Sequence, residues 1–272
     1  FEAGHTTAPD HMPDRAKKCL HSWWRPHTVD ARGLPPGALP DLADVIFTTP
    51  SHQCPTNATM PMARRRALLV KARDMDALIV EDDYEFEMAF LGAPSPSLKS
   101  LDRDGRVIYV GSFSKSIFPG LRLGYLVGPR PFIREACALR ASVLRHPPGL
   151  MQRTAAYFLS LGHYDSLIRR IPRAYADRRH VMEAALAQHG LTVAGRGLHG
   201  GSSIWMRARE GVDMGTIAMD LRGQGVLTEP GASFFHGDAP SRKYYRLAYS
   251  SIPSGQIAPG IALLARALQE WR

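Results

Sequence analysis

The chain has 272 residues, of which 44% are apolar and 22% are charged, and these proportions are typical of a globular protein rather than a disordered one. No apolar run reaches about 18 residues and no signal-peptide pattern opens the sequence, so we expect a cytoplasmic protein without membrane contact. The three cysteines lack metal-ligand spacing, and the net charge of +9 is spread along the chain without a helix-turn-helix, zinc-finger or RNA-binding signature, so neither a metal site nor direct nucleic-acid binding is predicted.

The first third of the chain predicts a strand that ends in a polar loop. After an irregular start, residues 30–37 form a turn-rich connector, and residues 44–48 (DVIFT) are typical of a core strand. This strand delivers residues 49–57 to one edge of a sheet. Asn57 is tolerable at the end of that loop because asparagine accepts left-handed backbone better than most residue types do.

A helix and a second strand follow. Residues 61–73 predict an amphipathic helix with Met62, Leu69 and Val70 facing inward and a basic outer face. Residues 77–80 (ALIV) predict a buried strand. The strand–helix–strand order therefore favours a parallel α/β sheet.

An acidic turn (EDDY) ends this second strand. Asp82 and Tyr84 are two positions apart on an extended segment, so both side chains can face the same side. Acidic residues at a strand end also cap helices or bind solvent, and this alternative stays open.

A lysine occupies the loop after the next strand. A short run (VIYV) predicts a buried strand, and Lys115 follows its carboxyl end, where α/β sheets bind ligands. A lysine amine attacks aldehydes, whereas the hydroxyls of Ser112 and Ser114 and the guanidinium of Arg122 suit phosphate oxygens. An aldehyde and a phosphate describe pyridoxal phosphate (PLP), whose pyridine nitrogen needs a carboxylate such as Asp82. A solvated surface lysine is the alternative.

Three motifs together carry a family resemblance. Residues 49–56 (TPSHQCPT), 79–84 (IVEDDY) and 111–125 (GSFSKSIFPGLRLGY) resemble the aminotransferase-like domain of MocR-type regulators, which belong to the GntR superfamily. The motifs stand in the family's order, and the resemblance spans roughly residues 29–272. It implies the fold type I architecture of PLP-dependent enzymes, which is an α/β fold.

That architecture implies a large domain with a mostly parallel sheet and a small α+β C-terminal domain. We accordingly predict three parts: an irregular remnant of the large domain at residues 1–28, the PLP-binding large domain at residues 29–160, and the connecting helix with the small domain at residues 161–272. The family's glycine-serine phosphate loop has no counterpart in the sequence, so we expect a large domain that is incomplete at its N-terminus.

The C-terminal half predicts helices followed by the small domain. Helices are expected at residues 131–145, 151–161, 164–189, 213–224 and 257–271. The third of these should break near Pro172, because proline removes a main-chain hydrogen bond. Strands are expected at residues 203–206, 226–228 and 244–249.

The resemblance also implies roles for single residues. Lys115 forms the internal aldimine with PLP, Asp82 pairs with the pyridine nitrogen, and Tyr84 lies near the ring hydroxyl. The phosphate is assigned to Ser112, Ser114 and Arg122. Arg246, in the strand at residues 244–249, holds the α-carboxylate of an amino acid, although a lone strand arginine is more often a surface residue.

Five further residues are open between a ligand role and a local one. His5 ends a segment similar to one whose aromatic side chain stacks on the cofactor ring, which places His5 over PLP, and a frayed terminus is the alternative. Cys54 stands where aminotransferases carry the asparagine that approaches the ring oxygen, and His52 or Gln53 can fill that role. For His52 a packed loop position is equally compatible. His199 either lines the ligand pocket or is a turn histidine without a ligand role.

The function implied is a PLP-binding domain that forms an external aldimine with an amino acid or other amine, as the effector-sensing part of a MocR-like transcriptional regulator. A catalytic PLP-dependent aminotransferase and a degenerate domain without PLP are the alternatives. The family's sites lie at a dimer interface, so a homodimer is expected. DNA would be bound only through an N-terminal domain that is not present in this chain.

Overall fold

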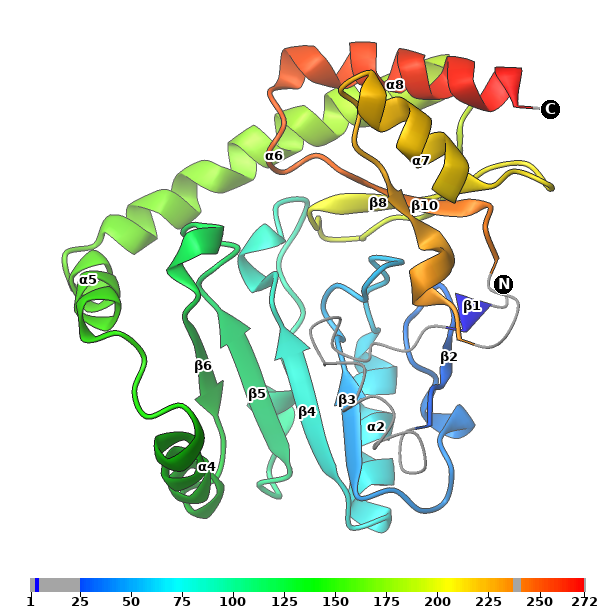
Figure 1. The fold of residues 1–272 in the computed structure, drawn as a ribbon. Coiled ribbons are helices and arrows are strands. Elements are labelled where there is room, and N and C mark those ends of the chain that lie inside the picture. The colour runs from blue at the N-terminus through cyan, green and yellow to red at the C-terminus, as the bar shows by residue number, and fades with distance from the viewer. Residues whose placement is uncertain (1–2, 5–24, 237–240, 272) are drawn as a thin grey trace.

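Two four-stranded sheets organise the part of the chain that the computed structural model describes, namely residues 3–4, 25–236 and 241–271. One sheet is mixed and the other is antiparallel, and the long helix α6 (His163–Gln188) crosses above them (Figure 1). A short antiparallel pair joins β1 (Ala3–Gly4) to β2 (Thr28–Val29). This arrangement confirms the predicted fold class, an α/β sheet followed by an α+β C-terminal part.

The mixed sheet has the order β3 (Val45–Thr48), β4 (Leu78–Asp83), β5 (Val107–Ser112) and β6 (Gly124–Val127). Strands β3, β4 and β5 are parallel, and β6 runs antiparallel to β5. The predicted mostly parallel sheet is therefore confirmed. Because the first three strands run the same way, the loops that follow them meet at one edge of the sheet.

Helix α2 (Met62–Asp74) packs against the mixed sheet by a different face from the predicted one. Its buried residues are Arg65, Leu68 and Ala72, which are spaced three and four apart and form one stripe. Val70, predicted to face inward, is 45% exposed. The error arose because the buried stripe includes an arginine, which hydrophobic periodicity cannot recognise.

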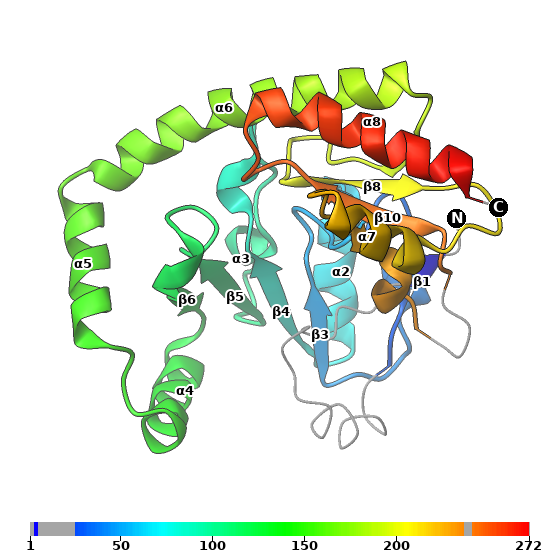
Figure 2. The same ribbon diagram turned by 45° about the horizontal axis from the view of Figure 1, so that its top comes forward.

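Strand β3 is half-exposed rather than a core strand. Its side chains alternate, with Ile46 and Thr48 buried and Val45 and Phe47 exposed. Strand β6, at the opposite edge of this sheet, is exposed along its whole length. Helices α4 (Arg130–Val143) and α5 (Gly149–Ser160) lie beyond β6 in both ribbon views (Figures 1 and 2).

The antiparallel sheet has the order β7 (Thr192–Gly195), β8 (Ser203–Arg207), β10 (Tyr244–Ala248) and β9 (Glu229–Pro230). Helices α7 (Met214–Gly223) and α8 (Ser254–Glu270) pack on it together with α6. The sequence did not predict β7, which is short and irregular near Gly195, and it placed β9 too early, at residues 226–228. The core of this part is separate from the core between α2 and the mixed sheet.

Helix α6 continues through Pro172, so the predicted break is wrong. A proline removes one main-chain hydrogen bond but does not have to end a helix that is held by packing. The second half of α6 supplies that packing, because Met182, Ala185 and Leu186 are buried in the core of the antiparallel sheet. No helix among the described residues is long and apolar enough to cross a membrane.

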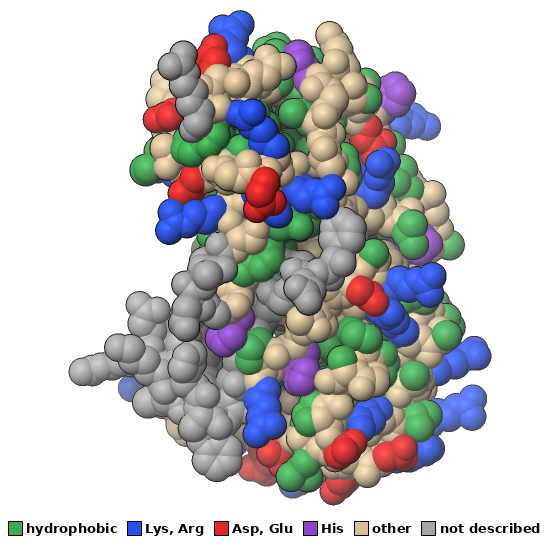
Figure 3. Space-filling model, turned by 90° about the vertical axis from the view of Figure 1, so that its right-hand side faces the viewer, with side chains coloured by type: hydrophobic (Ala, Val, Ile, Leu, Met, Phe, Trp, Pro, Cys, Tyr) green, Lys and Arg blue, Asp and Glu red, His purple; other side chains and the backbone are tan. Residues whose placement is uncertain are grey.

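The remaining helical segments are short: α3 (Leu98–Leu101), η1 (Pro36–Ala38), η2 (Phe86–Met88), η3 (Pro119–Leu121) and η4 (Gly231–Phe234). On the face shown in Figure 3, Lys and Arg side chains are interspersed with acidic and apolar ones. This pattern agrees with the predicted spread of the positive charge.

Candidate functional site

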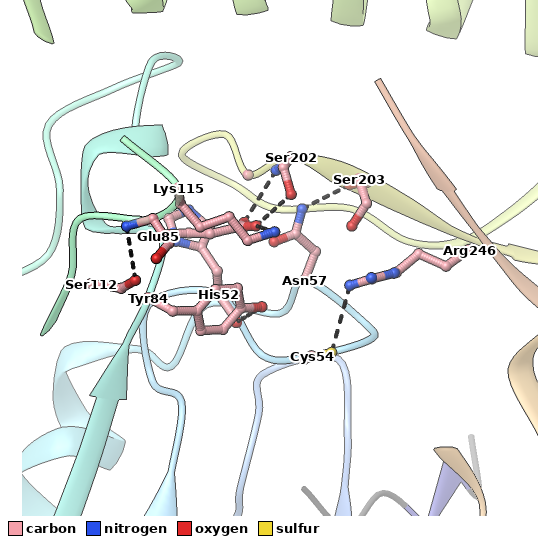
Figure 4. A network of polar contacts seen from close by, with 12 residues as sticks. His52, Cys54, Asn57, Tyr84, Glu85, Ser112, Lys115, Ser202, Ser203 and Arg246 are labelled. Atoms are coloured by element: carbon pink, nitrogen blue, oxygen red, sulfur yellow. Dashed lines mark hydrogen bonds and ion pairs between the residues drawn. The ribbon is translucent and has the colours of Figure 1, made fainter. Parts of the chain in front are cut away.

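The candidate site lies where the loops after β4 and β5 meet (Figure 4). Parallel pairing sets Asp82 beside Val110 near the carboxyl ends of the two strands. Lys115 follows β5 with a side chain that is 45% exposed, and its Nζ lies 5.8 Å from the centre of the Tyr84 ring. The structure therefore places Asp82, Tyr84 and Lys115 at one sheet edge, and Asp82 is exposed there.

Tyr84 is anchored to the loop after β3. Its hydroxyl donates to the carbonyl of His52 at 3.2 Å. Burial raises the pKa of Tyr84 and the nearby Glu85 carboxylate raises it further, so this residue is a neutral phenol. The phenol therefore reaches the site as a hydrogen-bonding group without charge.

His52 takes the position of a packed loop histidine. Its side chain is 4% exposed and neither ring nitrogen has a hydrogen-bond partner. Burial lowers the pKa of His52, which keeps the ring neutral. His199 lies close to it, and the two line a small cavity together with Ser51, Thr59 and Arg65. His5 lies outside the described residues.

The three predicted phosphate residues lie at the turn between β5 and β6. The N–H of Ser114 donates to the hydroxyl of Ser112 at 3.2 Å. Ser112 pairs with Gly124, and the N–H of Phe113 donates to the carbonyl of Leu123 at 3.0 Å. Arg122, just before that carbonyl, has left-handed backbone (φ 51°) and an exposed side chain.

Arg246 reaches this site from the antiparallel sheet. Its Nε donates to Glu229 at 2.5 Å, and its Nη1 lies 3.6 Å from the sulfur of Cys54, toward which the guanidinium points in Figure 4. Glu229 is its direct partner across the β10–β9 ladder. Cys54 thus meets the residue predicted to bind a carboxylate.

Sequence reasoning missed the residues that join the two sheets at this site. Asn57 has the expected left-handed backbone (φ 59°), but its side chain also donates to the carbonyls of Gly200 (3.3 Å) and Ser203 (2.8 Å). Glu85, directly after Tyr84, is 2% exposed and accepts from the N–H of Ser202 at 3.2 Å and from its hydroxyl. The only signal for Glu85 was a further acidic residue next to a matched motif.

A fully buried ion pair supports the loop that carries His52 and Cys54. Arg65 and Glu81 are both 0% exposed, with 3.8 Å between their charged atoms. Arg65 also donates to the carbonyls of Pro50, Met60 and Pro96 at 2.8, 3.0 and 3.0 Å. Arg65 was predicted to lie on an exposed basic face. This prediction is wrong, because three carbonyl oxygens and a carboxylate bind the guanidinium in the protein interior.

A third buried carboxylate, after Glu85 and Glu81, lies next to the site. Asp83 is 3% exposed and accepts from the hydroxyl of Tyr109 at 3.3 Å. Burial raises the pKa of Asp83 to about 7, and the Glu81 charge contributes to this rise. Tyr125 lies over Gly111, the cross-strand partner of Asp83; a Cβ there would come within 2.2 Å of its ring.

We expect Asp83→Asn to stabilise the protein above pH 7. The raised pKa means that the folded state binds more protons than the unfolded state between about pH 4 and 7, so the Asp83 contribution to stability falls as pH rises through this window. At pH 8 the variant should gain about 2–4 kcal/mol in free energy of unfolding, measured with urea. Asp82→Asn is the control, because Asp82 is exposed. An unchanged pH dependence in Asp83→Asn would contradict the assignment.

Comparison with known proteins agrees with the predicted family and fold. The family described as aminotransferase class I and II matches residues 43–253. The HTH-type transcriptional regulator TauR of Rhodobacter capsulatus is 59% identical over 241 residues, which are 89% of this chain and 50% of that protein. The probable rhizopine catabolism regulatory protein MocR of Rhizobium meliloti is 34% identical over 227 residues, 82% and 45% of the two chains. The chain thus spans about half the length of these curated relatives.

Solved structures give the same fold. The Pyrococcus horikoshii kynurenine aminotransferase, described in complex with PMP, is 30% identical with a TM-score of 0.79, and the match covers 89% of this chain and 62% of that one. These comparisons confirm the predicted aminotransferase-like domain with relatives among MocR-type regulators.

The residues at the sheet edge fit PLP, the cofactor of this family. Lys115 offers an amine, the kind of nucleophile that bonds to an aldehyde, on a side chain that is 45% exposed. Asp82 offers an exposed carboxylate and Tyr84 an uncharged phenol at the same edge. Among the described residues, no cluster of His, Cys, Asp and Glu could hold a metal ion.

Proposed function

Since the chain belongs to the aminotransferase class I and II family, we propose that it binds PLP through Lys115 and senses an amino acid or other amine within a transcriptional regulator. The observation that carries this proposal is the 59% identity to the regulator TauR over 241 residues. The proposal includes a cytoplasmic location and a DNA-binding segment outside this chain.

Each site residue has one task in the proposal. PLP supplies an aldehyde that bonds amines and a ring that withdraws electrons. Lys115 anchors it, the Asp82 carboxylate keeps a proton on the ring nitrogen, and the Tyr84 hydroxyl turns from the carbonyl of His52 to donate its hydrogen bond to a ring oxygen. The phosphate is held by Ser112, Ser114 and Arg122. In a sensor these residues bind and orient without completing a reaction, and the binding energy favours one protein conformation over another.

The proposal assigns the ligand's acid group to Arg246. We expect Arg246→Gln to weaken binding of amino acids to the PLP-loaded protein by about tenfold to a hundredfold, since a charge-assisted pair is worth roughly 1.5–3 kcal/mol. Binding of ethylamine, which has no carboxylate, should change little. Absorption titrations with L-alanine and ethylamine compare the two. An equal loss for both ligands would place Arg246 outside the carboxylate subsite.

Catalysis of transamination is the second candidate, favoured by the 30% identity to a kynurenine aminotransferase. In that case Lys115 also moves a proton at the α-carbon of the ligand. PLP-loaded protein is incubated with each of the twenty amino acids and 2-oxoglutarate. Accumulation of the matching keto acid indicates an enzyme, whereas a change of absorption without keto acid indicates a sensor.

A homodimer belongs to the same proposal. Apolar side chains are exposed on β6, α4 and α5, among them Leu126, Leu139, Val143, Leu150 and Tyr157. Large apolar side chains exposed on several neighbouring elements are expected at an association site. Analytical sedimentation at micromolar concentration measures the state, and a monomer alone would contradict the dimer.

A further inference from the structure

A buried carboxylate touches the candidate PLP lysine. The Oε1 of Glu85 lies 3.5 Å from the Nζ of Lys115, and Figure 4 shows the lysine amine and the carboxylate close together. Within the part of the chain that the structure describes, Lys115 is the one cationic side chain at ion-pair distance from Glu85. A carboxylate that is 2% exposed depends on such partners, because burial removes its hydration.

The other contacts of Glu85 go to the antiparallel sheet. Ser202, just before β8, donates to it through both its N–H and its hydroxyl. The carbonyl of Ser202 accepts from the N–H of Tyr249 at 3.0 Å, just after β10. Glu85 therefore links the amine of Lys115 to the ends of two central strands.

The backbone around Ser202 is also where the two sheets are held together. Asn57 from the mixed sheet donates to carbonyls on both sides of Ser202, at Gly200 and Ser203. Gly201 has positive φ (94°), and a Cβ there would lie 2.1 Å from the amide nitrogen of Asn57. Packing this close transmits a change in the hydrogen bonds of Ser202 to the contact between the sheets.

We propose that Glu85 senses whether the amine of Lys115 is free and passes this state to the antiparallel sheet through Ser202. The inference rests on the proposed function, in which the Lys115 amine bonds to the aldehyde carbon of PLP with loss of water and is released when a ligand amine takes its place. A free amine keeps its ion pair with Glu85. An amine bonded to the aldehyde carbon has at most one hydrogen left and is held at the cofactor, so the carboxylate charge is balanced mainly by the two donors of Ser202 and those hydrogen bonds strengthen.

Hydrogen exchange of the Ser202 amide tests the coupling with two forms of the cofactor. PLP bonds to Lys115, whereas pyridoxamine phosphate carries an amine in place of the aldehyde and leaves Lys115 free. We expect the Ser202 amide of the unmodified chain to exchange roughly twofold to fivefold more slowly with PLP than with pyridoxamine phosphate, the range for an ion pair with one half-exposed partner. Mass spectrometry after borohydride reduction measures PLP on Lys115 in the same samples.

Glu85→Gln keeps the shape and a hydrogen-bond acceptor for Ser202 but removes the charge, so the difference between the two cofactor forms should vanish while PLP still attaches. Ser202→Ala, which keeps the Glu85 charge and loses the hydroxyl contact, should reduce the difference and serves if the first variant does not fold. A difference that persists in both variants, or is missing in the unmodified chain with PLP attached, overturns the inference alone. Absence of PLP from Lys115 in the unmodified chain overturns the proposed function as well.

Discussion

Lys115→Ala should abolish covalent attachment of PLP. The side chain of Lys115 is accessible at the edge of the mixed sheet, and the Tyr84 ring and Glu85 carboxylate flank its amine. Among described lysines it alone follows a strand of the mixed sheet beside an acidic residue and a phenol, whereas Lys71, Lys99 and Lys243 pair with Asp41, Asp102 and Glu210. Alanine has no amine, so no bond to an aldehyde can form at this position.

The masses of the intact protein and of its proteolytic peptides are measured after incubation with PLP and reduction by borohydride. The unmodified chain should carry one PLP on Lys115, and the variant should carry none. Lys71→Ala, on the exposed side of α2, is the matched control and should retain the modification. PLP found on another lysine in the unmodified chain would remove Lys115 from the proposal, and equal labelling of many lysines would indicate surface reaction only.

The placement of the predicted site residues at one sheet edge could be predicted from the sequence because it is local. Asp82, Tyr84 and Lys115 each follow a short β-branched run, and parallel strands bring such loops to one edge. The positions of Ser112, Ser114 and Arg122 between two strands were predictable for the same reason. Neighbours in sequence at a strand end stay neighbours in the fold.

The contacts that join the two sheets could not be predicted in this way. Asn57 and Glu85 bond to Gly200, Ser202 and Ser203, which are more than a hundred residues away in sequence. No periodicity or turn signal connects positions so far apart. The backbone role of Asn57 was visible from its residue type, whereas its side-chain role appears only in the assembled fold.

The burial of charged side chains was predicted least well from the sequence pattern. Arg64, Arg65 and Arg66 are consecutive in α2, yet only the middle one is buried. A helical pattern assigns a face to each of them but does not reveal which inward position has carbonyls to receive a guanidinium. The buried position of Arg65 has a large expected energetic effect.

Arg65→Met should destabilise the protein by about 3–5 kcal/mol, because removing one partner of a buried ion pair leaves the other charge without compensation. The side chain of methionine fills similar space, but Glu81 loses its buried cation and three carbonyls lose a donor. Arg65→Lys should restore only part of the loss, since one ammonium cannot reach three carbonyls in the planar geometry of a guanidinium.

Urea unfolding of the PLP-free protein measures this effect, and Arg66→Ala on the exposed side of the same helix should stay within about 0.5 kcal/mol of the unmodified chain. Glu81→Gln combined with Arg65→Met tests the cause. If the unpaired carboxylate accounts for the loss, the double variant should be more stable than Arg65→Met alone, because the charge that needs Arg65 is gone. A double variant as unstable as the sum of the two single ones would assign the loss to the carbonyls of Pro50, Met60 and Pro96. Affinity for PLP should then fall with stability, because Pro50 and Met60 flank the loop segment that positions His52 and Cys54.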